Sequence, residues 1–174
     1  MKSLLVFFLL IQPLMLFGQS ERDKAIDLYR NGDFAKAIAI FENLIELKEA
    51  DYTSASYLGA AYVKVGKNKQ AVDTFLRLHS FGSPKTPLEY DKKIKIVSRP
   101  IARCRGIGGS IVKLAVELIK DGTVGFVFPF SENSASFRES VIEAAREIKF
   151  EPAVVKGNAV TIVLVFEYRC DLLR

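Results

Sequence analysis

The sequence predicts a mixed α and β fold, in which two helical hairpins precede a ββαβ domain with one helix on one face of a three-stranded antiparallel sheet. Two patterns predict this division. Small and apolar residues recur at a fixed spacing between residues 21 and 82, and apolar residues alternate with a period of two after Gly109. The composition agrees, because 49% of the 174 residues are apolar and 26% are charged, as in globular proteins.

Residues 1–20 are expected to be a secretory signal peptide. The positive start Met1-Lys2-Ser3 precedes an apolar run over 4–17, which is shorter than the roughly 20 residues of a membrane-spanning helix. Small residues favour cleavage after Gly18 or after Ser20, and a retained membrane anchor is the alternative. We therefore expect an exported, periplasmic protein that has no nucleic-acid partner and in which a disulfide is chemically permitted.

A shift of 34 residues aligns the two halves of the interval 21–82. The aligned pairs are Ala25 with Gly59, Leu28 with Tyr62, Gly32 with Gly66, Ala37 with Ala71, Phe41 with Phe75 and Leu44 with Leu78. Small residues let helices approach closely, and a glycine ends the first helix of each pair. The spacing predicts helices over 21–31, 34–48, 52–65 and 68–80. Their open end at Phe75, Leu76 and Leu78 needs a cover from residues 81–90, from the second domain or from a partner.

This interval resembles the tetratricopeptide repeat. The second copy carries the fuller motif in Leu58-Gly59, Tyr62, Gly66, Ala71 and Phe75. The resemblance implies that the concave face formed by the first helices binds an extended peptide. The alternative is that the repeats act only as a rigid spacer.

Positive charge is concentrated between the two predicted domains. Residues 83–105 contain seven Lys and Arg against two Asp and Glu, a net charge of +5, whereas residues 19–82 carry nine of each sign. The stretch also contains Pro84, Pro87 and Pro100. It is expected to be a basic linker, either simply solvated or attracting acidic components of the cell envelope.

The alternating pattern after Gly109 predicts a β-hairpin. A first strand over 110–120 and a second over 124–130 are joined by Asp121-Gly122, a pair typical of tight turns. Pro129 has no N–H to donate to a ladder, so the second strand should lie at a sheet edge or be bulged there.

A helix begins near Ser136, and a third strand is expected over Val160–Tyr168. The helix returns the chain to its starting end, so the third strand runs antiparallel to the first. If these two strands pair, the sheet order is 2-1-3 and the third strand has a free edge. This topology brings Cys104, before the first strand, beside Cys170, after the third. A disulfide between them is expected, with two free buried thiols as the alternative.

Residues from about 100 to 168 resemble the C-terminal domain of the TonB family. The matching residues are Gly106, Ile107, Gly109, Asp121, Gly122, Val124, Ser131, Ala144, Ala145, Phe150, Pro152, Ala153, Gly157 and Phe166. The resemblance makes residues 106–174 a TonB-like domain. It implies that this domain binds an extended segment of an outer-membrane TonB-dependent transporter, the TonB box, by adding it to the sheet as another strand.

The resemblance places the partner-binding edge on the third strand. Its residues are Val160, Thr161, Ile162, Val163, Leu164, Val165, Phe166, Glu167 and Tyr168. An exposed strand of this composition is prone to aggregation. We therefore expect the edge to be covered by a bound peptide, by a second copy in a homodimer, or by residues 92–97 of the linker.

The sequence does not predict an enzyme, a cofactor or a metal site. Its single histidine, His79, is expected at a helix end, so it forms neither a catalytic triad nor a metal cluster. The leading hypothesis is an exported TonB-like peptide-binding protein. The alternatives are a membrane-anchored TonB-type energy transducer for outer-membrane transport and a structural envelope adaptor that dimerises through its sheet edge.

Overall fold

The computed structural model describes residues 12–82, 88–102, 111–131 and 135–169. The first part of the described chain is helical. Its elements are α1 (Gln12–Arg30), α2 (Phe34–Glu46), α3 (Tyr52–Lys64), α4 (Asn68–Leu76) and the short 3-10 helix η1 (Leu78–Ser80). Helix α1 begins earlier than the expected residue 21, and it runs without a break through the expected cleavage positions 18–20.

Glycine residues set the turns and the packing of this helical layer. Gly32 and Gly66 have φ values of +86° and +74°, in the left-handed region that glycine adopts most easily. They follow α1 and α3, as the aligned spacing predicts. Gly59 lies so close to Phe75 that a Cβ atom there would be 2.7 Å from the aromatic ring. This contact explains why the α3–α4 hairpin needs a glycine at that position.

The central sheet consists of β2 (Ile111–Leu118), β3 (Val124–Pro129) and β7 (Ile162–Arg169), in the order β3-β2-β7. Both pairings are antiparallel, and β2 pairs with β7 along its whole length, from Ile111 opposite Arg169 to Leu118 opposite Ile162. Pro129 ends β3, which is an edge strand, as expected for a residue without an N–H group. The β2–β3 register shifts between Val116 and Leu118.

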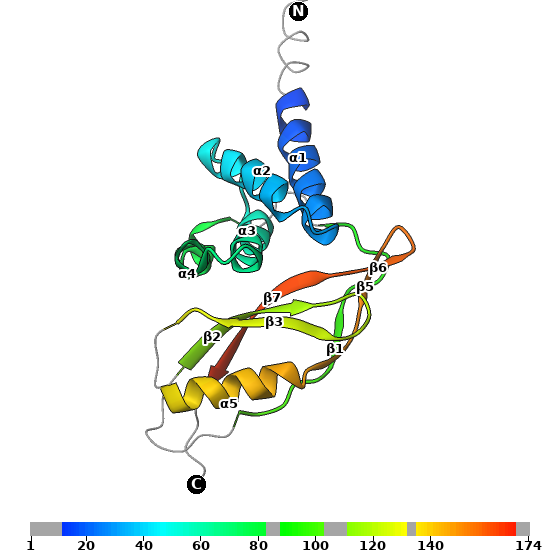
Figure 1. Ribbon diagram of the computed structural model, residues 1–174. Helices are drawn as coiled ribbons and strands as arrows, with labels where there is room; N and C mark the ends of the chain where they lie inside the picture. Colours follow the sequence, from blue (N-terminus) through cyan, green and yellow to red (C-terminus); the bar gives the residue numbers. More distant parts are fainter. Residues whose placement is uncertain (1–11, 83–87, 103–110, 132–134, 170–174) are drawn as a thin grey trace, which may run out of the picture.

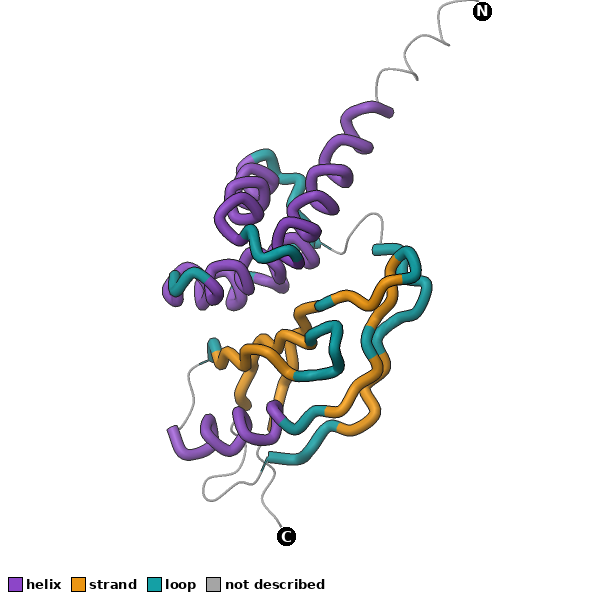
Figure 2. Tube along the Cα trace, turned by 45° about the vertical axis from the view of Figure 1, so that its right-hand side comes forward, coloured by secondary structure: helices purple, strands orange, loops and turns teal. Residues whose placement is uncertain are grey.

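Four short strands form a ribbon beside the central sheet (Figure 2). This ribbon was not predicted from the sequence. They are β1 (Lys95–Ser98), β4 (Lys149–Glu151), β5 (Ala153–Val155) and β6 (Asn158–Val160), paired as β1-β4 and β5-β6. The interval 83–105, expected as a linker, therefore contains a strand. Its alternating Ile94 and Ile96 pack against a hydrophobic core, which is what holds this strand in place. Residues 92–97 pair with β4 and β5 instead of covering β7.

Both faces of the sheet are covered (Figure 1). Helix α5 (Ala135–Arg146) lies on one face, where residues of β2 and β7 such as Leu114, Val116 and Phe166 form a core with Val141. Helices α1–α4 lie on the other face, where Ala115, Phe130 and Val163 join the helical core. The predicted mixed α and β fold is confirmed, and helices α1–α4, which were expected to form a separate domain, cover the second face of the sheet.

The β-sheet covers the α4 end of the helical layer. The ring of Phe75 lies 6.0 Å from that of Phe128 and 5.2 Å from that of Phe130, and Phe75 and Leu78 are buried. Leu76 stays 48% exposed. The sheet region is therefore one of the covers expected from the sequence, and Phe128 and Phe130 contact Phe75 directly.

Candidate functional site

The outer edge of β7 is the site that the sequence analysis singled out, and the hydrogen-bond pattern shows which backbone groups it presents. Lys113 of β2 directs its backbone toward β3, because its carbonyl accepts from the Phe130 N–H and its N–H donates to Ser131 Oγ. Residues of a strand bond alternately to its two neighbours. Lys113 lies opposite Glu167, so Glu167 directs its N–H and C=O away from β2.

The same alternation extends along β7. Thr161, just before the strand, and the odd-numbered residues of the strand direct their backbone groups outward, while the even-numbered residues bond to β2. The outward set in the strand is Val163, Val165, Glu167 and Arg169. Side chains from distant parts of the chain contact two outward carbonyls, those of Thr161 and Glu167.

At the first end, the carbonyl of Thr161 accepts two hydrogen bonds from the helical layer. Tyr57 Oη donates at 3.3 Å and Arg30 Nε at 3.4 Å. Burial raises the pKa of Tyr57 to about 12, and the nearby Arg30 charge partly opposes this rise. The phenol therefore remains a neutral donor, and this end of the edge is closed by α1 and α3.

At the other end, Arg99 donates from Nη2 to the carbonyl of Glu167. Its guanidinium carbon also lies 4.3 Å from the ring centroid of Tyr168 and 5.3 Å from that of Phe166. Arg99 thus contacts the face of β7 directed toward α5 and also reaches around to the outer edge. It is supplied by the residues just after β1.

Between these ends lies a short segment of edge at Val163, which is 6% exposed, and Val165, which is half-buried. In the part of the chain that the structure describes, no hydrogen bond from outside the sheet reaches the backbone of Val163 or Val165. The side chain of Val163 is packed in the helical core, and that of Val165 is half-buried against it. We call the outward backbone groups of these two residues the edge window.

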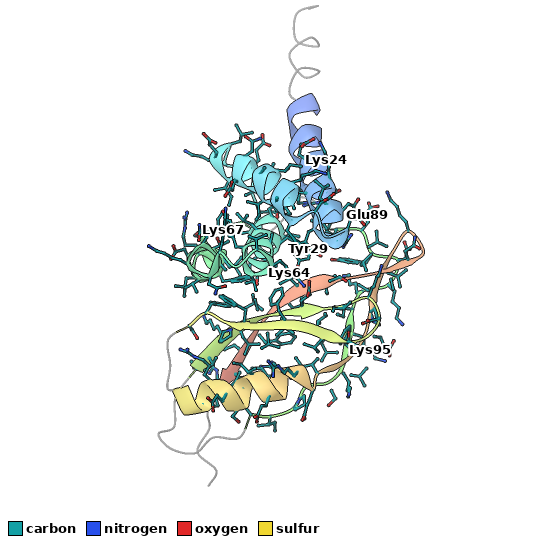
Figure 3. All side chains as sticks on the ribbon, in the orientation of Figure 1. Lys24, Tyr29, Lys64, Lys67, Glu89 and Lys95 are labelled. Atoms are coloured by element: carbon teal, nitrogen blue, oxygen red, sulfur yellow. The ribbon has the colours of Figure 1, made fainter. Side chains whose placement is uncertain are left out.

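A polar cluster joins the helical layer to the sheet on the covered face. Glu117 of β2 is 3% exposed, and its carboxylate accepts 2.7 Å hydrogen bonds from Tyr29 Oη and Lys64 Nζ. Figure 3 shows the labelled Tyr29 and Lys64 side chains between the helices and the sheet. Gly125 makes room for the carboxylate, since a Cβ atom there would lie 2.2 Å from Glu117 Oε2.

The structure distributes the residues predicted for the binding edge over two strands. Ile162 to Tyr168 belong to β7, whereas Val160 ends β6 and pairs with Ala153, and Thr161 lies between the two strands. The prediction that Val160 belongs to the closing strand is therefore wrong. The chain turns sharply at Lys156 and Gly157, both of positive φ, so that β6 pairs back onto β5 before β7 begins.

The predicted fold-motif residues lie in turns and in the ribbon. Gly122 has a φ of +89° in the β2–β3 hairpin, where Asp121 Oδ1 accepts from the Thr123 N–H. Phe150 is buried opposite Ile96, and Pro152 separates β4 from β5. Gly157 has a φ of +76° and donates its N–H to Asp91. Gly109, Cys104 and Cys170 lie outside the described residues.

Sequence reasoning missed the residues that close the ends of the edge. Arg30 and Tyr57 belong to helices that were assigned to a separate domain, and Arg99 belongs to the interval assigned to a linker. Their only sequence signal is that Arg99 follows the alternating apolar residues of β1, which indicate a strand. Nothing in that pattern indicates which backbone carbonyl the arginine meets.

No protein-family model matches the chain, and no curated protein matches it. Within the described ranges, no group of three or more His, Cys, Asp and Glu side chains is placed to hold a metal ion. None of the described helices is both long enough and apolar enough to cross a membrane.

Proposed function

We propose that this protein is an exported, TonB-like peptide-binding protein whose β7 edge receives an extended segment of an envelope partner as an added strand. The observation that carries this proposal is the edge window at Val163 and Val165. Two residues with outward N–H and C=O groups offer up to four backbone hydrogen bonds to a guest strand. At about 0.5–1.5 kcal/mol net for each bond, such docking is weak and reversible.

The partner class follows from the resemblance of residues 106–174 to the C-terminal domain of the TonB family. We propose a TonB-box-like segment of an outer-membrane transporter as the guest. Backbone pairing tolerates changes in guest sequence, because the ladder is made by main-chain groups. A guest of three to five residues would cover the edge window and approach Thr161 and Glu167 at its ends.

We propose that the mature chain begins after residue 18 or 20. Residues of α1 beyond these positions pack against the rest of the protein, and Arg22, Ala25, Ile26 and Tyr29 are buried. Arg22 forms a 2.9 Å ion pair with Asp51 at the start of α3. A chain cut at either predicted position would keep all of these contacts. N-terminal sequencing of the protein purified from the envelope tests this against the retained anchor of a TonB-type energy transducer.

We propose that the helical layer braces the sheet instead of offering a second peptide-binding face. Its first helices, α1 and α3, direct Tyr29, Tyr57 and Lys64 at the sheet and at the chain entering β7. These are the helices that would form the concave binding face of a tetratricopeptide array. With the sheet seated there, the helices hold one end of the edge closed.

The experiment that tests strand addition is a pair of proline variants. In Val165→Pro the lost N–H points outward, so the β2–β7 ladder stays intact while the edge window loses a donor. In Leu164→Pro the lost N–H bonds to β2, so this variant should lower the melting temperature strongly. Val165→Thr is the matched control, because it keeps the N–H.

Binding of fluorescent TonB-box-like peptides is the readout. We expect Val165→Pro to lose binding with its circular dichroism spectrum unchanged, and Val165→Thr to bind as the wild type does. Equal affinity of folded Val165→Pro and wild type would rule out strand addition at this edge. Sedimentation could instead show a wild-type dimer that Val165→Pro converts to monomers. The edge would then be the dimer interface of a structural adaptor.

A further inference from the structure

Arg99 holds an unusual position at the Glu167 end of the β7 edge. Its guanidinium donates to an outward carbonyl of the strand and stacks on two aromatic rings of the same strand, Phe166 and Tyr168. Arg99 is itself solvent-exposed. Among the described residues it forms no ion pair with a carboxylate. Within the described ranges, the Arg99 cation therefore sits at the edge without a carboxylate partner.

The carboxylate of Glu167, the residue whose carbonyl Arg99 contacts, is already paired. Glu167 forms a 3.0 Å ion pair with Arg169, two residues along the strand. Side chains of residues 167 and 169 share one side of β7, whereas Phe166 and Tyr168, under the guanidinium, lie on the other. The Arg99 charge therefore faces the α5 side of the edge, away from that ion pair.

We propose that Arg99 is a displaceable stopper of the β7 edge and that, once displaced, it selects guest strands that carry a carboxylate. This inference rests on the proposed function, because it concerns the same edge. It implies that the edge is closed at Thr161 and can be opened at Glu167. It also implies that the edge prefers a guest strand with a negative charge.

The displacement follows from the geometry of strand addition. A guest backbone lies about 4.8 Å from β7 and would donate its own N–H to the Glu167 carbonyl. The guanidinium then loses one hydrogen bond, but it keeps both aromatic rings as a platform. The guest side chain that points toward the α5 side at this level meets the cation, and a carboxylate is the group that a guanidinium binds best.

The Thr161 end of the edge differs from the Glu167 end, and this difference sets the register of the guest strand. Arg30 lies 3.5 Å from the carboxylate of Asp27, so its charge is already shared, and its Thr161 contact is reinforced by Tyr57. Opening that end would require α1 and α3 to leave the sheet. The guest is therefore expected to extend from Val163 toward Glu167, because only the Arg99 end yields to it.

The test uses the full mature chain and two sets of labelled heptapeptides in which valine and threonine alternate. One set carries a single Glu, moved through each position in turn, and the other carries Gln at the same position. For at least one position we expect the wild type to bind the Glu peptide about threefold to tenfold more tightly than its Gln counterpart at low salt. The ratio should shrink in high salt.

Arg99→Ala should remove the preference and leave the neutral peptides bound as tightly as before, or more tightly, because the Glu167 carbonyl is then free. Arg99→Lys should keep part of the preference, since it keeps the charge. Arg77→Ala is the matched control: Arg77 is also exposed and stacked on an aromatic ring, but that ring belongs to Phe81. It should keep the wild-type ratio.

The outcomes separate the two proposals. If Arg99→Ala keeps the Glu preference, or loses neutral peptides that the wild type binds, Arg99 is not a stopper with charge selection, although strand addition stands. If neither wild type nor Arg99→Ala binds any peptide, both proposals are overturned together. If Arg99→Ala loses the Glu preference but still binds the neutral peptides, both proposals are supported.

Discussion

Tyr29 and Glu117 are 88 positions apart in the sequence, yet the Tyr29 hydroxyl donates a 2.7 Å hydrogen bond to the Glu117 carboxylate. The bond joins the first helix of the chain to the central strand of the sheet. Lys64 supplies the compensating charge from α3 at 2.7 Å. A buried carboxylate is costly unless it is paired and hydrogen-bonded, so this cluster favours one arrangement of the helices on the sheet.

Replacing Tyr29 with phenylalanine should lower the free energy of unfolding by about 1.5–3 kcal/mol, because it removes a hydrogen bond to a buried charge. The pKa of Tyr29 lies far above its ordinary value, first through burial and then through Glu117, so the phenol donates at every pH at which the protein is folded. Chemical denaturation measures the change. Tyr52→Phe, at a 40% exposed position, should change stability by less than about 0.5 kcal/mol. Equal effects of the two variants would contradict a structural role for the Tyr29 bond.

Gly125→Ala should destabilise the protein by about 1–3 kcal/mol, because the added methyl group would displace the Glu117 carboxylate. Gly82→Ala is the control, since a Cβ atom there meets nothing within 4 Å. Combining Gly125→Ala with Tyr29→Phe tests the mechanism. If the carboxylate is what moves, the double variant should lose less stability than the two single losses added together. Strict additivity would show that Gly125 acts independently of the cluster.

Glu151 should titrate well below an ordinary glutamate. Hydrogen bonds and charge from Lys92 and Lys95 lower its pKa from 4.5 to about 2. Because the folded value is the lower one, these ion pairs stabilise the ribbon above about pH 4.5, and that stabilisation is lost as the pH falls toward 2. An NMR titration of the side-chain carboxyl carbon checks this. In Lys92→Met/Lys95→Met the midpoint should move back toward 4.5, and an unmoved midpoint would exclude both lysines as the cause.

Amide hydrogen exchange should alternate along β7. The N–H groups of Val163 and Val165 point outward and have no partner in the described part of the chain, so they should exchange faster than those of Leu164 and Phe166, which bond to β2. Exchange followed by NMR on the free protein resolves these residues. Adding a peptide that binds the edge should slow the exchange of the outward amides and leave the exchange of the other amides unchanged. Equal protection of all four amides in the free protein would mean that the edge is already covered.

The predicted Cys104–Cys170 disulfide is tested by intact mass. Cys170 directly follows Arg169, whose partner across the sheet is Ile111. The native protein without reductant should resist alkylation, and reduction should release two thiols. Replacing both cysteines with serine should then cost about 2–5 kcal/mol of stability. Two alkylatable thiols in the unreduced native protein would show that the cysteines are free.

Periodicity predicted the elements whose pattern is strong and local. The helices near 34–48, 52–65 and 68–80 follow from paired glycines and small residues, and β2 and β3 follow from alternation around Asp121-Gly122. The short strands β4, β5 and β6 escaped notice because three residues are too few to show a period. Glu117 alternates with apolar neighbours and so has the pattern of a solvent-facing position, yet it is buried.

By itself, the sequence determined the local elements and the apolar stripes that each must bury, because helix and strand periods are properties of neighbouring residues. Only the tertiary structure decided that the helical layer covers the second face of the sheet, which leaves the edge of β7 as the candidate binding surface. It also decided which donors close that edge. Arg30, Tyr57 and Arg99 meet Thr161 and Glu167 across separations of 131, 104 and 68 residues, and contacts at such distances depend on how whole layers pack.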